Sequence, residues 1–430
     1  MELPPIADFQ EDREARLHHR HSGWRAYLVA LPVVAACAVV AFLGATGPKG
    51  TPSDAARPSA HSTPTSHWTA APTPGPIDIP GLSTMQVSDS DMVTAALPPD
   101  TLPLDADGGN FLYATAGRLY VLASNQTPLT PIQLATARPC GQIEKGSLSG
   151  TDVIYSEIVP AGYSGDGSEG CPGFGGTVDW DVSITDFVGV THQIASGTYA
   201  FPASIGPAAP VPDVAIANGT YGFSRPDGSG KSAVVEIRRL ADDAVQYKSV
   251  ALTLPLQLRL GDRRLVVVSS GPAPRDGLDD MLLVWSTTDW SHSLDPAGLA
   301  FGPVAVSRDG RRLVFAGCEQ EGDKRKCDSL ETFEPDGHRS KQLPTPATFV
   351  SVDSGSNSRL NATAWISSAF DGRPYIGVES ALGDKPMALA VAQTPVWASI
   401  NDDTVVWLSL ADGGGAYLNR MDLPPALRAP

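Results

Sequence analysis

The chain has 430 residues, with 47 acidic and 31 basic side chains, and a formal net charge of −16 at pH 7. This length allows a large hydrophobic core and more than one domain. A surface of this charge repels phosphate backbones, which argues against nucleic-acid binding. The basic residues are 23 Arg and 8 Lys, and Ala, Gly and Pro are abundant, a composition that favours a high-GC, actinobacterial-type bacterial source.

The N-terminal part of the sequence predicts a membrane anchor. Residues 1–25 are polar and mixed in charge, and we interpret them as a cytoplasmic tail. Residues 26–46 carry no charge over 21 positions, enough to cross a bilayer as one helix. Four Arg residues precede this run, against one Lys and one Arg shortly after it, which places the tail inside the cell. We interpret the run as an uncleaved signal anchor; the alternative is a signal peptide cleaved after Leu43-Gly44-Ala45.

A spacer follows the anchor. Residues 47–85 are rich in Pro, Ser, Thr and Ala, and their low apolar content prevents a packed core. The sequence therefore predicts a disordered, extended stalk that holds residues 86–430 away from the membrane. Localisation follows from this order: a single-pass protein of the cell membrane with its larger domain outside the cytoplasm.

Residues 86–430 contain a repeated strand pattern. Two less regular units, around 111–134 and 153–187, precede five regular ones. The first strands of the regular units recur at steps of 44, 46, 46 and 47 residues, at Val214, Leu258, Val304, Val350 and Trp397. Four short strands in about 45 residues are typical of a β-propeller blade. We therefore expect an all-β propeller, with seven blades preferred and six or eight possible.

Each regular unit begins with the same local sequence pattern. In four of the five, a turn containing Asn or Asp, or Gly next to Asp, follows the first strand, as at Asp309-Gly310. The second strands are continuously apolar, as in 265–268 and 405–408, because neighbouring blades cover both faces. The first unit lacks a visible first strand and the last lacks a fourth, so we expect segments from the two ends to pair and close the ring.

One repeat carries a family resemblance. The segment Ser307-Arg308-Asp309-Gly310-Arg311-Arg312-Leu313-Val314-Phe315 resembles the core of the TolB-like (WD-repeat-like) propeller repeat of bacteria, with Arg308 in place of the usual Pro. The resemblance implies a propeller fold. It implies no catalytic residue, because the motif consists of a turn and a buried strand.

The cysteines predict two disulfides. Cys140, Cys171, Cys318 and Cys327 lie in the repeat region, without a C-x-x-C motif or nearby histidines that would indicate zinc. Two disulfide bonds in an oxidising compartment fit these positions better. Cys318 and Cys327 flank an eight-residue hairpin loop, and Cys140 and Cys171 are expected on the same face of the second unit.

Several motifs suggest chemistry, but each departs from its pattern. Residues 228–232 match the end of a phosphate-binding loop, but Arg225 stands where that motif needs Gly. Residues 162–166 miss the last Gly of a nucleophile elbow. Asp105, Asp107 and Asn110 have the spacing of calcium ligands without the downstream Glu, so we interpret them as an Asp-Gly turn. We predict no catalytic residue, no metal ligand and no cofactor.

Loop lengths indicate a working face. The loops between second and third strands are long, at 159–178, 224–232, 269–281 and 317–328, and they share a face with the links between blades. We expect a ligand to contact this face around four aspartates, which are Asp166, Asp227, Asp276 and Asp371.

The sequence therefore favours a binding, recognition or sensor module at the cell surface, whose partner is an extracytoplasmic protein or glycan. A propeller hydrolase or lyase acting on cell-wall sugars or peptides is one alternative. A scaffold for other envelope proteins is another. Fold alone does not decide among the three.

Overall fold

The computed structural model describes residues 77–427 with gaps, the longest of which are 124–129, 166–170, 201–210, 271–279, 295–299, 334–338 and 353–361. The predicted tail, anchor and most of the stalk lie outside the described residues. Within the part that is described, no helix has the length and apolar character needed to cross a membrane.

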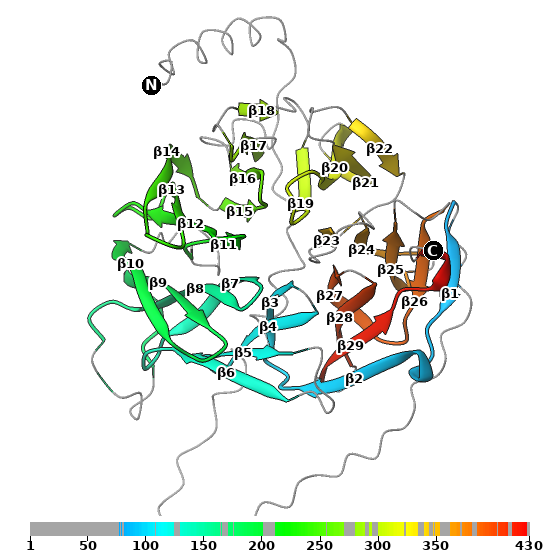
Figure 1. The fold of residues 1–430 in the computed structure, drawn as a ribbon, viewed down its shortest axis with the longest axis horizontal. Coiled ribbons are helices and arrows are strands. Elements are labelled where there is room, and N and C mark those ends of the chain that lie inside the picture. The colour runs from blue at the N-terminus through cyan, green and yellow to red at the C-terminus, as the bar shows by residue number, and fades with distance from the viewer. Residues whose placement is uncertain are drawn as a thin grey trace, which may run out of the picture.

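The described strands form seven sheets arranged around a common centre (Figure 1), and each sheet is one blade of a β-propeller. Blade 1 consists of β3 (Leu102–Asp107), β4 (Asn110–Thr115), β5 (Arg118–Leu122) and β6 (Pro131–Thr136), and blade 2 consists of β7 (Gln142–Ser149), β8 (Asp152–Pro160), β9 (Thr177–Asp186) and β10 (Thr191–Ala200). Blade 3 consists of β11 (Val214–Ala217), β12 (Thr220–Pro226), β13 (Ser232–Arg239) and β14 (Val245–Thr253), and blade 4 consists of β15 (Leu256–Leu260), β16 (Arg264–Ser270), β17 (Asp280–Ser286) and β18 (His292–Leu294).

Blades 5 to 7 complete the ring. Blade 5 consists of β19 (Ala300–Val306), β20 (Leu313–Glu321), β21 (Lys324–Phe333) and β22 (Arg339–Leu343). Blade 6 consists of β23 (Phe349–Val352), β24 (Thr363–Ser368), β25 (Pro374–Glu379), β26 (Met387–Ala390) and β1 (Ser83–Gln86). Blade 7 consists of β27 (Thr394–Asn401), β28 (Thr404–Leu410), β29 (Ala416–Asp422) and β2 (Met92–Leu97). Two short 3-10 helices accompany them, η1 (Asp89–Asp91) and η2 (Pro425–Leu427).

The repeat pattern located these blades correctly. All five predicted first-strand positions fall in the first strand of a sheet, namely β11, β15, β19, β23 and β27. The second strands are buried on both faces, as their continuous apolar runs require: eight of the nine residues of β8 are buried. Successive apolar clusters lie between neighbouring sheets, such as the one that joins Ile154 and Trp180 of blade 2 to Phe223 of blade 3.

The ends of the chain close the ring, as predicted, but one expectation was wrong. β2 pairs antiparallel with β29 along six residues and supplies the outermost strand of blade 7 (Figure 1). Blade 1, however, does not lack a first strand, because β3 fills that place. Pro103 and the two aspartates of β3 interrupt its apolar pattern, which hid the strand in the sequence.

The packed part of the chain also begins earlier than position 86. β1 lies parallel to β26, with Ser83 opposite Met387, and widens blade 6 to five strands. Upstream, Ile77 is 3 % exposed and packs against Tyr375 and Ala388. The end of the predicted stalk is therefore part of the propeller.

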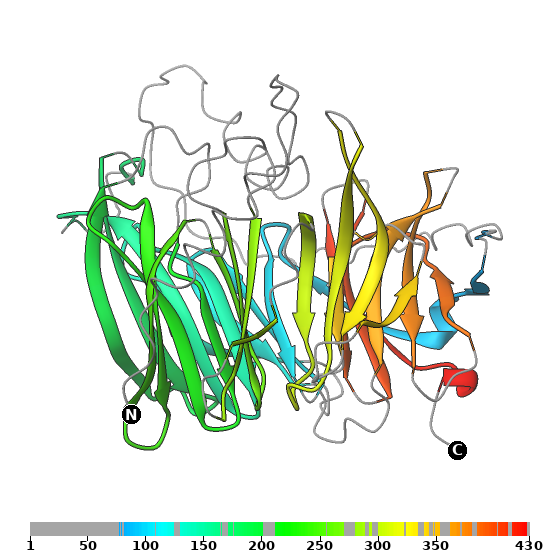
Figure 2. The same cartoon turned by 90° about the horizontal axis from the view of Figure 1, so that it is seen from above.

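The ring has two faces, which the side view separates (Figure 2). We call the side with the turns between strands one and two, and between three and four, the turn face. The side with the connections between strands two and three, and between blades, is the loop face. The long loop predicted at 317–328 on the loop face was wrong, because β20 and β21 continue pairing as far as Glu321 and Lys324. Its polar residues extend a hairpin.

Candidate functional site

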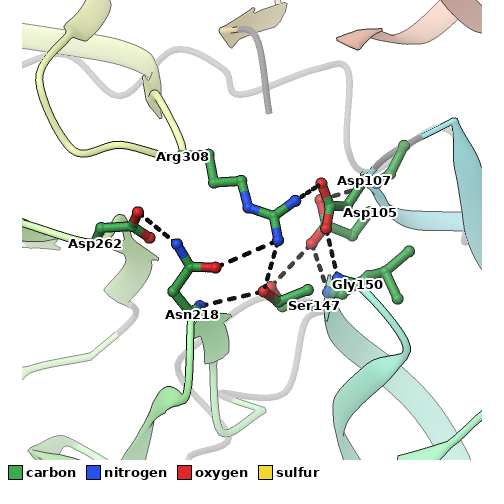
Figure 3. Close-up of polar contacts among 10 residues, drawn as sticks. Asp105, Asp107, Ser147, Gly150, Asn218, Asp262 and Arg308 are labelled. Carbon is green, nitrogen blue, oxygen red and sulfur yellow. Dashed lines mark hydrogen bonds and ion pairs between the residues drawn. The ribbon is translucent and has the colours of Figure 1, made fainter. Parts of the chain in front are cut away.

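Polar side chains from five blades meet near the centre of the ring on the turn face (Figure 3). We call this group the axial clasp. Its members come from the ends of inner strands or from the turns that follow them, and they are Asp105, Asp107, Ser147, Ser149, Asn218, Asp262 and Arg308.

The turn of the TolB-like segment positions the central cation of the clasp. The Ser307 hydroxyl donates to Asp309 Oδ1 at 2.6 Å and accepts the Arg312 N–H at 2.9 Å, which fixes the turn. Gly310 has a φ of +66°, and a Cβ there would lie 2.6 Å from the backbone nitrogen of Arg263 in the adjacent blade 4 turn. This close approach, which only Gly allows, holds the turns of blades 4 and 5 together.

Arg308 extends from this turn across the centre of the ring. One terminal nitrogen pairs with Asp107 Oδ1 of blade 1, and the other donates to Asn218 Oδ1 of blade 3 at 3.4 Å. Asp107 is only 5 % exposed, and its second oxygen accepts the Gly150 N–H of blade 2 at 2.6 Å. A buried ion pair with these additional hydrogen bonds is well compensated, so Arg308 ties blade 5 to blades on the far side of the ring.

Asn218 links two more blades within the clasp. Its side-chain amide donates to Asp262 of blade 4, and its backbone N–H donates to Ser149 Oγ of blade 2 at 3.2 Å. Its φ of 35° lies in the left-handed region, which Asn tolerates better than most residues. Burial raises the pKa of Asp262, while Asn218 and Arg308 act in the opposite direction.

Asp105 lies beside Asp107 and is bound by protein donors. Its Oδ2 accepts the Ser147 hydroxyl at 2.9 Å and the Leu148 N–H at 2.8 Å, and its Oδ1 accepts the Ala106 N–H at 2.9 Å. Burial raises the pKa of Asp105 to about 6, against the effect of these hydrogen bonds. Both aspartates thus face N–H and O–H donors, the environment of a structural turn, as predicted. No cluster of His, Cys, Asp or Glu that could hold a metal occurs among the described residues.

The loop face carries the predicted Cys140–Cys171 disulfide, which is confirmed. Its Cα atoms are 5.3 Å apart, and it joins the link entering blade 2 to the insertion between β8 and β9. Cys140 adopts a φ of 60°, so the link turns sharply at the residue that carries the bond. The insertion is therefore fixed covalently at Cys171 to the link that enters blade 2.

Arg138 fixes the same link electrostatically. Its side chain contacts Glu157 Oε1 at 3.2 Å and Asp181 Oδ2 at 2.7 Å, and its backbone N–H donates to Glu157 Oε1 at 2.8 Å. The two carboxylates are direct partners on β8 and β9. Burial raises the pKa of both, and Arg138 opposes the shift. Gly141 leaves room for the pair, because a Cβ there would lie 2.3 Å from Glu157 Oε1.

Blade 3 holds the opposite charge arrangement. Glu236 on β13 is 5 % exposed, and three cations surround its carboxylate. Arg238 donates to Oε2 at 2.9 Å, while Arg225 and Lys248 approach Oε1 at 3.4 Å and 3.3 Å. The guanidinium groups of Arg225 and Arg238 also lie over the ring of Phe223, at 5.8 Å and 5.7 Å from its centroid. Burial alone would raise the pKa of Glu236, but the combined effect of the three cations is larger, and the pKa is lowered.

Of the four predicted binding aspartates, the structure describes only Asp227. Its Oδ1 accepts the Ser229 hydroxyl at 2.7 Å and its Oδ2 accepts the Ser232 hydroxyl at 2.7 Å, within its own turn on the loop face. These bonds and two backbone N–H groups lower its pKa, although burial acts the other way. Asp166, Asp276 and Asp371 lie outside the described residues.

The second predicted disulfide is only partly located. The side chains of Cys318 and Cys327 lie outside the described residues. The backbone pairs Gly317 with Ser329 and Glu319 with Lys326, so both cysteines fall at the irregularity between these two pairs of adjacent strands. The bond stays a prediction.

Sequence reasoning missed the axial clasp and the cation cluster of blade 3. Asp107 and Arg308 are 201 residues apart, and no local pattern joins them. The signals that could have been followed are Arg308, where the repeat usually has Pro, and two aspartates at the end of a strand.

Comparisons with known proteins found only distant structural similarity. No family model matches the chain, and no curated protein matches it. Among solved structures, a chain of the mitotic checkpoint complex is 10 % identical with a TM-score of 0.47, covering 86 % of this chain and 100 % of that one. The propeller domain of the trilobed protease from Pyrococcus furiosus is 12 % identical with a TM-score of 0.43, covering 65 % and 82 %.

A third solved structure, the acylaminoacyl peptidase of Pyrococcus horikoshii, is 13 % identical with a TM-score of 0.43, covering 66 % of this chain and 46 % of that one. Similarities of this size carry no inference about activity, substrate or partner.

Proposed function

We propose that this chain is a recognition or sensor module, anchored in the cell membrane through residues 26–46, whose propeller binds an extracytoplasmic partner through its loop face. The partner is a protein or a glycan, and the contact lies over blades 2 to 4. The observation that carries the proposal is the disulfide between Cys140 and Cys171, which fixes a long insertion at Cys171 on that face.

Two consequences of the disulfide support this function. A stable disulfide is expected in an oxidising compartment, which agrees with the topology that the Arg-rich flank of residues 26–46 predicts. An insertion that is held by a covalent bond loses less conformational freedom when it binds, so more of its contact energy contributes to affinity. The added hold of Arg138 on Glu157 and Asp181 acts in the same direction.

The axial clasp and blade 3 differ in the groups they offer to a partner. In the clasp, the carboxylates accept hydrogen bonds from other blades, and Arg308 is paired. On blade 3, Arg225 lies near the loop-face end of β12 and Lys248 lies midway along β14, with side chains that are 41 % and 59 % exposed. Blade 3 therefore offers cations that a partner can reach from the side of the loop face.

The test is capture of envelope proteins or glycans by the full-length chain in detergent. Shortening residues 162–170 to a tight turn should abolish capture, and shortening 272–278 should weaken it, while both variants keep the circular-dichroism spectrum and melting temperature of the parent. A matched control replaces Val188 and Val190 by Ser, in an exposed hairpin of blade 2 on the turn face, and should leave capture unchanged. Capture that survives both loop deletions places the site elsewhere.

Topology has its own test. Protease added to intact cells should remove residues 90–430 and spare the tail. Complete protection of the propeller would contradict the membrane arrangement while leaving the binding face open to the capture assay.

A further inference from the structure

Two partly exposed cations on blade 3 converge on one carboxylate oxygen. Arg225 Nε lies 3.4 Å and Lys248 Nζ lies 3.3 Å from Glu236 Oε1. Because both distances end on the same atom, the two side chains converge on one point of blade 3. Arg225 Nε is itself buried, so the terminal nitrogens of this partly exposed guanidinium are the ones that can face a ligand. The carboxylate itself is already bound from its other side by Arg238.

The strand alternation explains why these groups share a surface. Phe223 and Arg225 are two residues apart on β12 and therefore point to the same face of the sheet. Glu236 is the direct partner of Phe223 on β13, and Lys248 is the direct partner of Glu236 on β14. Phe223 packs into the cluster shared with blade 2, so this face of blade 3 borders the blade that carries the insertion.

The aromatic ring and the buried carboxylate hold the cations in place. Phe223 is fully buried, and the Arg225 guanidinium lies over its ring with its Nε toward Glu236. No other partner of the Arg225 or Lys248 side chain is found among the described residues. Two carboxylates thus face three cations, because Asp243 pairs with Arg238 while Glu236 contacts all three, and the positive charge of the group is only partly neutralised in a chain whose net charge is −16.

The seam next to these cations is joined by one interblade hydrogen bond. The Ala200 N–H at the end of β10 donates to the Gly228 carbonyl at 2.9 Å, which places the loop-face end of blade 2 against the turn that follows β12. Phe174, from the disulfide-bound insertion, packs against the same apolar cluster as Phe223. The insertion and the aromatic ring under Arg225 therefore belong to one apolar cluster that joins blades 2 and 3.

We propose that Arg225 and Lys248 form a binding site for an oxyanion group, a carboxylate or a phosphate, carried by the partner. This inference rests on the proposed function, since it assigns the chemistry of the group that the loop face of blades 2 and 3 recognises. Arg225 supplies the terminal edge of a guanidinium, which suits a planar two-oxygen acceptor, and Lys248 supplies a mobile point charge.

The test titrates the full-length chain with two probes, a hexaglutamate peptide and inorganic pyrophosphate, by isothermal titration calorimetry at low and at physiological salt. At least one probe should bind, more weakly as salt rises. Arg225→Gln and Lys248→Gln should each weaken binding about fivefold or more, because each removes one of two charges on the ligand. Arg225→Lys should retain most of the affinity, which separates the charge from a structural role of the side chain.

The matched control is Arg239→Gln, which removes the same charge from an exposed pair with Asp242 at the turn-face end of blade 3. It should change probe binding by less than about twofold. The preferred probe identifies the chemistry, carboxylate or phosphate. If neither probe binds, or if Arg225→Gln and Lys248→Gln behave like Arg239→Gln, the oxyanion site is wrong.

The two proposals fail separately. Shortening residues 162–170 should abolish capture of the envelope partner and leave hexaglutamate or pyrophosphate affinity intact. If Arg225→Gln loses probe binding but captures the partner as well as the parent does, the partner does not use this site and the inference is overturned, while the proposed function stands.

Discussion

Blades 2 and 3 both bury carboxylates, but the number of cations around these carboxylates differs, and their pKa values shift in opposite directions. In blade 2, Glu157 and Asp181 are 9 % and 16 % exposed and share one cation, Arg138. In blade 3, Glu236 is 5 % exposed and has three cations, and Asp243 takes part of the charge of one of them, Arg238. The pKa is raised for both acids of blade 2 and lowered for Glu236.

Burial alone would raise all three pKa values, so the number of cations decides the direction. The consequences for stability have opposite signs. The raised pKa values of Glu157 and Asp181 make blade 2 more stable in acid and cost stability as the pH rises through them. The lowered pKa of Glu236 gives stability above about pH 4, the usual Glu value, which is lost as the pH falls through the folded pKa.

The largest effect is expected from removing the disulfide that fixes the insertion of blade 2. Replacing Cys140 and Cys171 together by Ser should lower the free energy of unfolding by about 3–4 kcal/mol, because the bond closes a loop whose ends are 31 residues apart. Urea unfolding under non-reducing conditions measures it. The parent chain treated with a reductant should shift in the same way. An unchanged midpoint would mean that Arg138 and packing suffice to fix the link.

Removing Arg138, the one cation that Glu157 and Asp181 share, comes next. Arg138→Gln should cost about 2–3 kcal/mol at pH 8, less than for a fully buried pair because Arg138 is 43 % exposed. The cost should shrink at pH 5, where Glu157 and Asp181 take up protons more readily. Urea titrations at the two pH values measure this. Adding Asp181→Asn should restore part of the loss, and a cost that is larger at pH 5 would contradict the assignment.

The third change removes Glu236, the carboxylate that the three cations of blade 3 share. Glu236→Gln should cost about 1–2 kcal/mol at pH 7, because Arg225 and Lys248 can turn toward water while Arg238 keeps Asp243. The difference from the parent should begin to shrink below about pH 4, the usual Glu value, and should disappear once the pH is below the lowered folded pKa of Glu236. Thermal melts across this range test the sign, and a difference that grows in acid would show that cations do not control Glu236.

The smallest effect sets the scale for the others. Arg239 and Asp242 form a 3.1 Å ion pair whose side chains are 53 % and 50 % exposed. Arg239→Gln should change the free energy of unfolding by no more than about 0.5 kcal/mol, and less at high salt. Unfolding at two ionic strengths measures it. A loss above about 1 kcal/mol would mean that an exposed ion pair on blade 3 contributes as much to the free energy of unfolding as Glu236 does. The number of cations around a buried carboxylate would then no longer explain the difference between blades 2 and 3.

Much of the fold could be predicted because each blade repeats a local pattern. The turn at Asp309-Gly310 and the apolar second strand 313–315 contain enough information to locate a blade without knowing its neighbours. Topology then placed Cys140 and Cys171 on one face, and the bond is present. Local signals failed where polarity and pairing conflict, as in β20 and β21, whose polar ends continue to pair beyond Gly317.

The candidate site was harder to predict because its contacts join distant blades. Asp105 and Asp107 read as a turn, and their partners Leu148 and Arg308 lie 43 and 201 residues away. The oxyanion site has shorter separations, but Arg225 was weighed only as a departure from a phosphate-loop motif. Its position over Phe223 and beside Glu236 depends on strand register, which composition does not reveal.

The pairing of β2 with β29 also sets the order of events during folding. Thr94 donates to Asn419 Oδ1 at 2.9 Å across 325 residues, so one edge of blade 7 is made long before the other. Until Ala416–Asp422 has been synthesised, β2 has unsatisfied backbone groups that any other strand edge can engage. Contacts of such long sequence separation form slowly, and cooperative closure of the ring waits for them. The synthesis of β29, which completes blade 7 with β2, therefore controls when the nascent chain stops being prone to mispairing.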